Sequence, residues 1–130
     1  MKEKNISLSI RNLTKSKSPN LPFLNIKNAA LGKGYSLSLV FAGDKLTKKL
    51  NLKYRGKKYP PNVLSFPLGK ESGEIFINLK QAKKESTLFG KSPQKFVGYL
   101  LIHGLLHLKG LEHGSTMEHT EKRIGKKFHI

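Results

Sequence analysis

Three histidines in the last third of the chain have a spacing that could do chemistry. His103 and His107 are four residues apart, which on a helix places both imidazoles on one face, one turn apart. His113 follows after Gly110, a residue type common at helix ends, so the chain can fold a third imidazole back towards the first two. Three protein ligands plus water is the pattern of a catalytic zinc site. The spacing therefore predicts a metal site with hydrolytic capacity.

The alternative is that these histidines are structural. Residues 99–106 are apolar nearly all round, which predicts a largely buried helix, and an unsatisfied buried imidazole costs about 1–3 kcal/mol. Ordinary hydrogen bonds could satisfy one or two such rings, whereas a third at this spacing favours a metal. The chain has no cysteine, so nitrogen and oxygen ligands would bind zinc, nickel or another divalent transition metal. His119 and His129 lie in polar surroundings and are expected to be solvated.

Two nearby residues bear on the mechanism. In zinc proteases of the H-E-x-x-H type the residue after the first histidine is the glutamate base, but here it is Gly104, which argues against a protease. A glycine inside a helix costs about 1 kcal/mol relative to alanine. Close approach of a backbone or a substrate would explain it, and so would packing. Ser65 has no adjacent base and is expected to be structural.

The segments that must position these residues follow from periodicity and from residues typical of helix ends. Asp44 is expected to cap one helix, Ser92 with Pro93 to start a longer one, and Ser115 with Glu118 to form a capping box. Alternating or β-branched runs predict strands at 6–10, 36–41, 63–66 (ended by Pro67) and 74–77. Helices are expected at 21–31, 44–54, 78–88, 93–109 and 115–128.

This order of elements predicts an α+β fold in which a small four-stranded mixed sheet is flanked by about five helices. The metal site would lie on the long buried helix and the loop after it. A length of 130 residues is expected to form a single domain, 1–130. The strand order does not follow from one sequence.

The charge of the chain indicates its partners. The formal net charge is +17, which attracts polyanions, so RNA is the first candidate. Because only three of the 25 basic residues are arginines, a lysine-rich surface that merely solvates the fold is the alternative. No segment is apolar over a length that would span a membrane, and no signal peptide is evident. We expect a cytoplasmic protein without a membrane partner.

A family resemblance is carried by the histidine segment. Residues 103–113 read HGLLHLKGLEH and resemble the H-G-x-L-H-L-x-G-x-D-H signature of YbeY-type endoribonucleases, the bacterial rRNA maturation factors. Glu112 replaces the aspartate of that signature. Further segments similar to the family run from about residue 46 to 124. They include Tyr54-Arg55-Gly56, Asn62 to Pro67, Gly73-Glu74-Ile75, and Met117-Glu118 with Glu121.

The resemblance implies a zinc-dependent endoribonuclease that cuts single-stranded RNA in 16S rRNA processing and ribosome quality control. Its partners would be 16S rRNA and the small ribosomal subunit with its proteins, and DNA is not expected. His103, His107 and His113 would bind Zn²⁺, which lowers the pKa of its water towards ~7. The alternative is a non-catalytic ribosome-assembly factor with a structural metal, for which Glu112 would be the fourth ligand to consider.

Arg55 is the candidate second catalytic residue. Its guanidinium can bind two phosphate oxygens at once, so we expect it to hold the scissile phosphate and stabilise charge in the transition state. Lys57 and Lys58 would contact neighbouring phosphates, although a solvated loop explains them nearly as well. No general acid is assigned.

Overall fold

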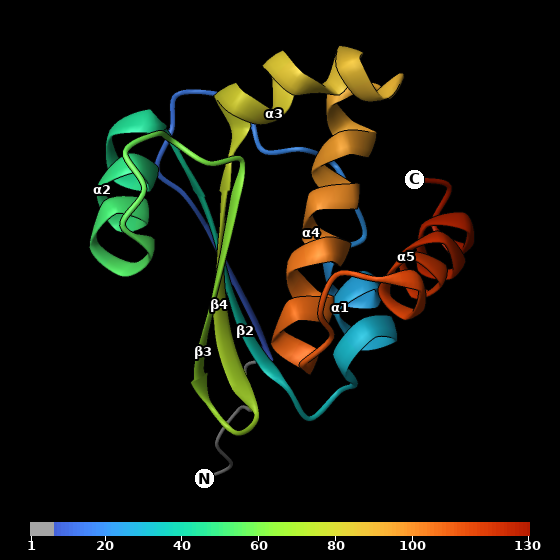
Figure 1. The fold of residues 1–130 in the computed structure, drawn as a ribbon. Coiled ribbons are helices and arrows are strands. Elements are labelled where there is room, and N and C mark those ends of the chain that lie inside the picture. Colours follow the sequence, from blue (N-terminus) through green and yellow to red (C-terminus); the bar gives the residue numbers. More distant parts are fainter. Residues whose placement is uncertain (1–6) are drawn as a thin grey trace, which may run out of the picture.

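A four-stranded mixed sheet forms the centre of the computed structural model, which describes residues 7–130 (Figure 1). The order across the sheet is β1-β2-β4-β3, with β1, β2 and β4 parallel and β3 antiparallel to β4. The strands are β1 Leu8–Asn12, β2 Ser36–Ala42, β3 Val63–Gly69 and β4 Ser72–Asn78. The first strand was expected at 6–10. It runs two residues further than that, and residue 6 lies outside the described residues.

The helices cover the two faces of this sheet unequally. One face carries α1, α4 and α5, and α2 lies on the opposite side (Figure 1). The helices are α1 Phe23–Leu31, α2 Asp44–Arg55, α3 Leu79–Ser86, α4 Pro93–Lys109 and α5 Ser115–Lys127, with a short 3₁₀ turn η1 at Thr87–Phe89. The α+β fold predicted from the sequence, with its four-stranded sheet and five helices, is confirmed. Among residues 7–130, no helix is both long and apolar enough to cross a membrane.

Alternation along the central strands explains why both faces are covered. On β2, Leu37, Leu39 and Phe41 point into the main core with α1 and α4, because alternate residues of a strand face opposite sides. Val40 and Ala42 point the other way into a smaller apolar cluster beneath α2. The main core, which is completed by α4, is therefore the layer that fixes the position of the histidines.

Helix α4 begins and ends where the sequence predicted. The Ser92 hydroxyl accepts a hydrogen bond from the Lys95 amide at 3.2 Å, and Pro93 occupies the first turn. At the other end Gly110 adopts φ 103°, a left-handed conformation that suits glycine. Nine of the residues between are buried, from Phe96 to Leu106. This helix is therefore anchored along nearly its whole length.

Three local expectations were wrong. Asp44 is the first residue of α2, with Gly43 as the cap, and its carboxylate accepts hydrogen bonds from Asn78 and Gln81 instead. Ser115 likewise lies inside α5 after Gly114, with no side-chain cap. Pro67 does not end β3, which continues to Gly69; β3 is an edge strand, where a missing amide donor is tolerated.

Candidate metal centre and cleft

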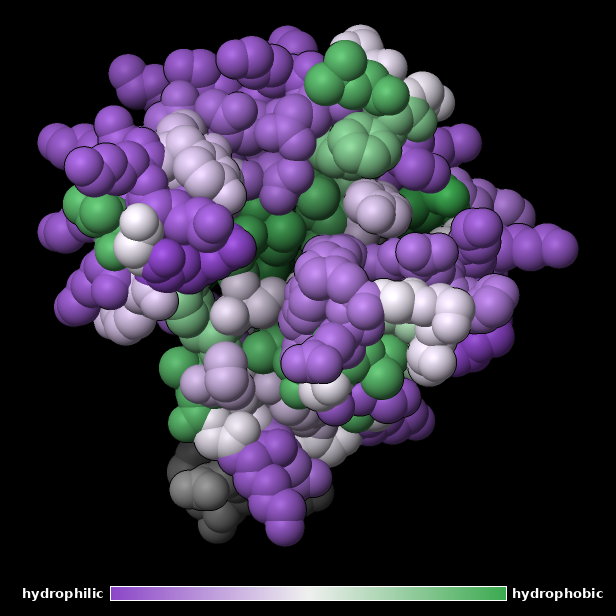
Figure 2. All heavy atoms as spheres, in the orientation of Figure 1, coloured by the Kyte–Doolittle hydropathy of each residue, from purple (hydrophilic) through white to green (hydrophobic). Residues whose placement is uncertain are grey.

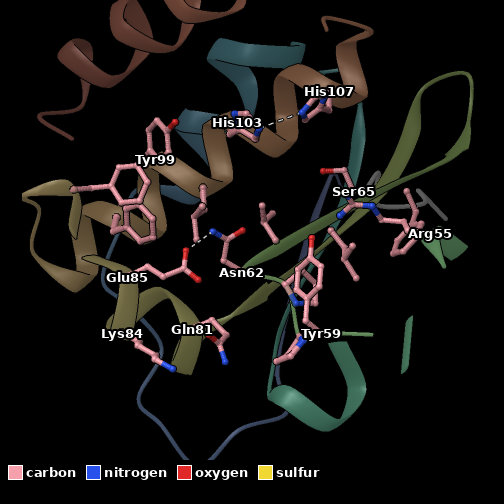
Figure 3. A pocket seen from close by; sticks show the side chains of 18 of the residues that line it. Arg55, Tyr59, Asn62, Ser65, Gln81, Lys84, Glu85, Tyr99, His103 and His107 are labelled. Atoms are coloured by element: carbon pink, nitrogen blue, oxygen red, sulfur yellow. Dashed lines mark hydrogen bonds between the residues drawn. The ribbon is translucent and has the colours of Figure 1, made fainter. Parts of the chain in front are cut away.

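The three histidines converge at the C-terminal end of α4. Their ring centroids lie 4.7 to 5.1 Å apart, and one nitrogen from each ring lies within 4.8 Å of the others. The Nε2 atoms of His103 and His107 are 3.1 Å apart (Figure 3). His113 reaches them from the loop after Gly110, as its spacing predicted. This cluster could hold a metal ion.

Glu121 on α5 orients the first of these rings. Its carboxylate makes a short hydrogen bond with Nδ1 of His103, and both side chains are largely buried. A carboxylate on Nδ1 fixes the ring and leaves Nε2 free to bind a metal. Sequence reasoning noted Glu121 only as part of the family resemblance. Its contact with α4 arises from the packing of two helices, which the sequence does not reveal.

The surroundings of His107 favour the neutral imidazole, which is the form that binds metals. Burial lowers its pKa, and positive charge on His103 or His113 would lower it further, whereas a hydrogen bond with the backbone of Leu111 acts in the opposite sense. A ligand imidazole must be unprotonated, so a lowered pKa favours metal binding at neutral pH.

The donor set fits a divalent transition metal. Three imidazoles match the ligand preference of zinc, and also of nickel, copper or iron. Among the described residues, the cluster of possible ligands comprises these three histidines alone. Glu112 is exposed and lies outside it. Three protein ligands would leave a coordination position for water or substrate, as in catalytic sites.

A cleft of about 1180 Å³ opens beside the cluster. It is visible as a hollow near the middle of the face in Figure 2, where apolar side chains lie at the bottom and hydrophilic ones surround them. All three histidines line it from the α4 side. Tyr59 and Arg55 line it from the opposite wall (Figure 3). A ligand in the cleft would contact both walls.

Arg55 is brought to the cleft by the end of α2. The helix stops at Gly56, with φ 67°, and the Asn51 amide donates to the Tyr59 carbonyl at 2.8 Å, tying the following loop back to the helix. Among the described residues, no carboxylate forms an ion pair with Arg55, whereas Arg11 lies 3.8 Å from Glu74. The Arg55 guanidinium is thus available to an anionic ligand.

The two predicted lysines differ from Arg55. Lys57 and Lys58 are exposed on the loop beyond α2 but do not line the cleft. The lysine that does line it is Lys84 on α3, which sequence reasoning did not single out. Its position follows from the packing of α3 against α4, and the sequence alone does not indicate that these helices are neighbours.

Ser65 and Gly104 form the junction between β3 and α4. The Ser65 hydroxyl donates to the Gly104 carbonyl at 3.2 Å, a structural role as expected. A Cβ on residue 104 would lie 2.8 Å from that hydroxyl and 3.1 Å from Ile75 Cδ1. Packing against the sheet therefore explains the glycine within α4. His119 and His129 are exposed, as expected.

Comparison with known proteins gives a consistent result. Residues 2–129 match the sequence model of the family described as Endoribonuclease YbeY. Proteins named Endoribonuclease YbeY include one from Syntrophomonas wolfei, 33% identical over 82% of this chain and 85% of its own length. Another, from Phytoplasma mali, is 44% identical over 64% of this chain. The chain spans only 58% of that Phytoplasma relative and 66% of one from Petrotoga mobilis.

A solved structure shares the fold. The solution structure of a Thermotoga maritima protein superposes with a TM-score of 0.65, covering 93% of this chain and 88% of its own, at 23% identity. The histidine segment, the cleft and the match across nearly all residues agree: the chain belongs to the YbeY endoribonuclease family.

Proposed function

We propose that this protein is a metal-dependent endoribonuclease that cleaves single-stranded RNA. The observation that carries the proposal is the placement of three convergent imidazoles on one wall of the cleft and Arg55 on the other. A phosphodiester between these walls would meet a metal on one side and a guanidinium on the other. Membership of a family named for RNA cleavage supports the same reading.

Each residue of the site has a proposed task. His103, His107 and His113 hold the metal, with zinc the best match to their chemistry, and Glu121 keeps His103 in the binding orientation. When bound, such a metal polarises phosphate oxygens and lowers the pKa of water. Arg55 holds the phosphate and stabilises charge that develops on it. Lys57 and Lys58 would meet flanking phosphates just outside the cleft.

The biological setting proposed is 16S rRNA processing on the small ribosomal subunit, in the cytoplasm, by the chain acting as one domain. It rests on the family resemblance together with the net charge of +17, which draws the protein to RNA. The alternative is an assembly factor with a structural metal. The three-histidine donor set favours the enzyme, since structural zinc sites take four protein ligands.

The deciding experiment measures cleavage of a single-stranded RNA by purified protein whose metal content is quantified. We expect wild type to cleave and His107→Ala to lose both metal and cleavage while its circular dichroism is unchanged. His119→Ala, an exposed histidine outside the cluster, is the matched control. If wild type carries one metal per chain yet cuts no RNA, alone or in ribosomal particles, the assembly-factor reading replaces the enzyme.

Arg55 is tested by Arg55→Lys. The variant keeps the charge but loses the planar fork, so we expect cleavage to fall at least about tenfold with metal content unchanged. Exposed Arg123→Lys serves as the control. Full activity of Arg55→Lys would remove the residue from the mechanism.

A further inference from the structure

The cleft extends past the metal cluster to an end that the proposed chemistry does not use. There an aromatic platform, formed by Phe89, Phe96 and Tyr99, lines it. Phe96 is fully buried, and the Phe89 and Tyr99 rings stack against it with centroids 4.9 and 5.8 Å away. Phe89 nevertheless remains 54% exposed. The Phe89 ring is thus supported on one face by Phe96, and the rest of the ring is open to a ligand.

A group of hydrogen-bond acceptors borders this platform. Glu85 precedes Phe89 by one helical turn, and its Oε1 accepts from the Asn62 amide at 2.8 Å (Figure 3). The Gln81 amide is directed to Asp44, at 3.0 Å. Each amide NH₂ has two N–H groups and gives one of them to a carboxylate, so both carbonyl oxygens, Glu85 Oε2 and one N–H of each amide remain for a ligand. We call Asn62, Gln81 and Glu85 the acceptor set.

The charge of Glu85 decides which part of a nucleic acid belongs here. It is the sole carboxylate among the described residues that line the cleft, in a protein of net charge +17. A phosphate would be repelled from it, whereas a base can stack on an aromatic ring and donate hydrogen bonds to a carboxylate. The place beside the Glu85 carboxylate is therefore suited to a base, and Lys84 on the same helix is left to meet a flanking phosphate.

We propose that the aromatic platform and the acceptor set form a nucleobase subsite that prefers bases with an exocyclic amine over uracil. Cytosine, adenine and guanine each present an NH₂ group that can donate to the Glu85 carboxylate, whereas the single ring N–H of uracil lies between two carbonyl oxygens that the carboxylate would repel. The Tyr99 ring centroid lies 6.1 Å from that of His103, so a base held here belongs to a nucleotide close to the cleaved bond. The inference rests on the proposed function only in taking RNA as the ligand.

The stacking part is tested by binding, measured as fluorescence anisotropy of a labelled hexacytidine RNA whose integrity is checked afterwards on a gel. Phe89→Ala should weaken binding about tenfold, and Phe89→Trp should restore it, because loss of one stacked base has effects of that order. Leu88→Ala is the matched control, since Leu88 is 82% exposed on the same turn but does not line the cleft. Unchanged binding by Phe89→Ala would overturn the platform.

The acceptor part is tested by a ratio of affinities. Wild type should bind hexacytidine about tenfold more tightly than hexauridine, a value typical of one good base contact. Glu85→Gln removes a negative charge and will strengthen binding to both, so the cytidine-to-uridine ratio is the informative quantity and should fall towards one. Exposed Glu71→Gln, outside the cleft, should leave the ratio intact. A ratio that Glu85→Gln does not change would overturn base recognition by this residue.

Failure of this inference can be told apart from failure of the proposed function. If wild type never cleaves RNA but Phe89→Ala and Glu85→Gln change binding as described, the nucleobase subsite is supported and the proposed endoribonuclease function is rejected. If wild type cleaves RNA but binds hexacytidine and hexauridine equally well, the proposed function is supported and the nucleobase subsite is rejected.

Discussion

At the scale of single residues, the contact between His103 and Glu121 links the metal cluster to the last helix. The carboxylate holds one imidazole from a helix that supplies no ligand itself. The cluster therefore depends on how α5 packs against α4.

Replacing Glu121 tests this dependence. Glu121→Gln retains the shape of the side chain but weakens the bond that orients His103, so metal affinity should fall about 10–100-fold. A competitive chelator titration measures it. Glu118→Gln, on the exposed side of the same helix, should bind metal as wild type does. If Glu121→Gln bound the metal as tightly as Glu118→Gln does, Glu121 would not orient the His103 ligand.

The sequence predicted the three histidines but not their support. Four-residue spacing and a following glycine are local signals, so the cluster could be inferred without a structure. Glu121 was named only within a family-like segment and without a role, and Lys84 was not named, because the positions of both depend on contacts between distant segments. Arg55 was found through its surrounding motif, and its cleft position agrees with that inference.

At the scale of elements, the crossing of α4 over β3 is close because Gly104 has no side chain. Gly104→Ala would place a methyl group 2.8 Å from the Ser65 hydroxyl, and relieving that contact should cost about 1–3 kcal/mol of unfolding free energy. Urea denaturation measures it. Gly125→Ala on α5 is the control: its Cβ would lie 3.6 Å from the Ile130 carbonyl oxygen, an ordinary contact, so it should stabilise by up to about 1 kcal/mol. A neutral Gly104→Ala would contradict the packing account.

Asp44 joins the starts of α2 and α3. Hydrogen bonds from Gln81 and Asn78, with Lys80 nearby, lower its pKa from 3.8 to about 2. A carboxylate whose pKa is lower in the folded state stabilises the fold above pH 3.8, and this stabilisation is lost as the pH falls towards 2.

The pH dependence provides the measurement. Asp44→Asn should be less stable than wild type at pH 7, and the difference should shrink on acidification between about pH 4 and 2, followed by urea denaturation at several pH values. Exposed Glu71→Gln should show no such convergence. A difference that stays constant with pH would mean that the charge of Asp44 is irrelevant.

Helix ends were predictable where one residue type dominates the local conformation. Helix α4 is the example: Ser92 and Pro93 determine where it begins, and Gly110 determines where it ends. Asp44 and Ser115 were misread because a glycine directly before each provides the cap position, and the Asp44 side chain bonds to another element. Pro67 was misread because its tolerance depends on β3 being an edge strand, and strand order is a tertiary property.

At the scale of the whole molecule, the charge of +17 is distributed over many lysines, and only some lie near the cleft. Binding of single-stranded RNA weakens with salt in proportion to the phosphates neutralised, with a slope of about −0.7 per contact. Lys84→Gln should reduce that slope by about 0.7, whereas Lys33→Gln, exposed and outside the cleft lining, should not. Equal effects would mean that RNA does not follow the cleft.

The arrangement of core and helices also sets an order of events during synthesis. The apolar face of the sheet, with Leu39 and Ile75, is covered chiefly by α4, which is made after all four strands. Until residues 93–109 leave the ribosome, α1 is the only one of the three helices on that face that is available to cover it, and the apolar surface and strand edges that remain exposed favour misassociation. The helix that carries two of the histidines is thus also the one that closes the fold. A nascent chain therefore buries the apolar face of its sheet and acquires these two metal ligands at the same stage.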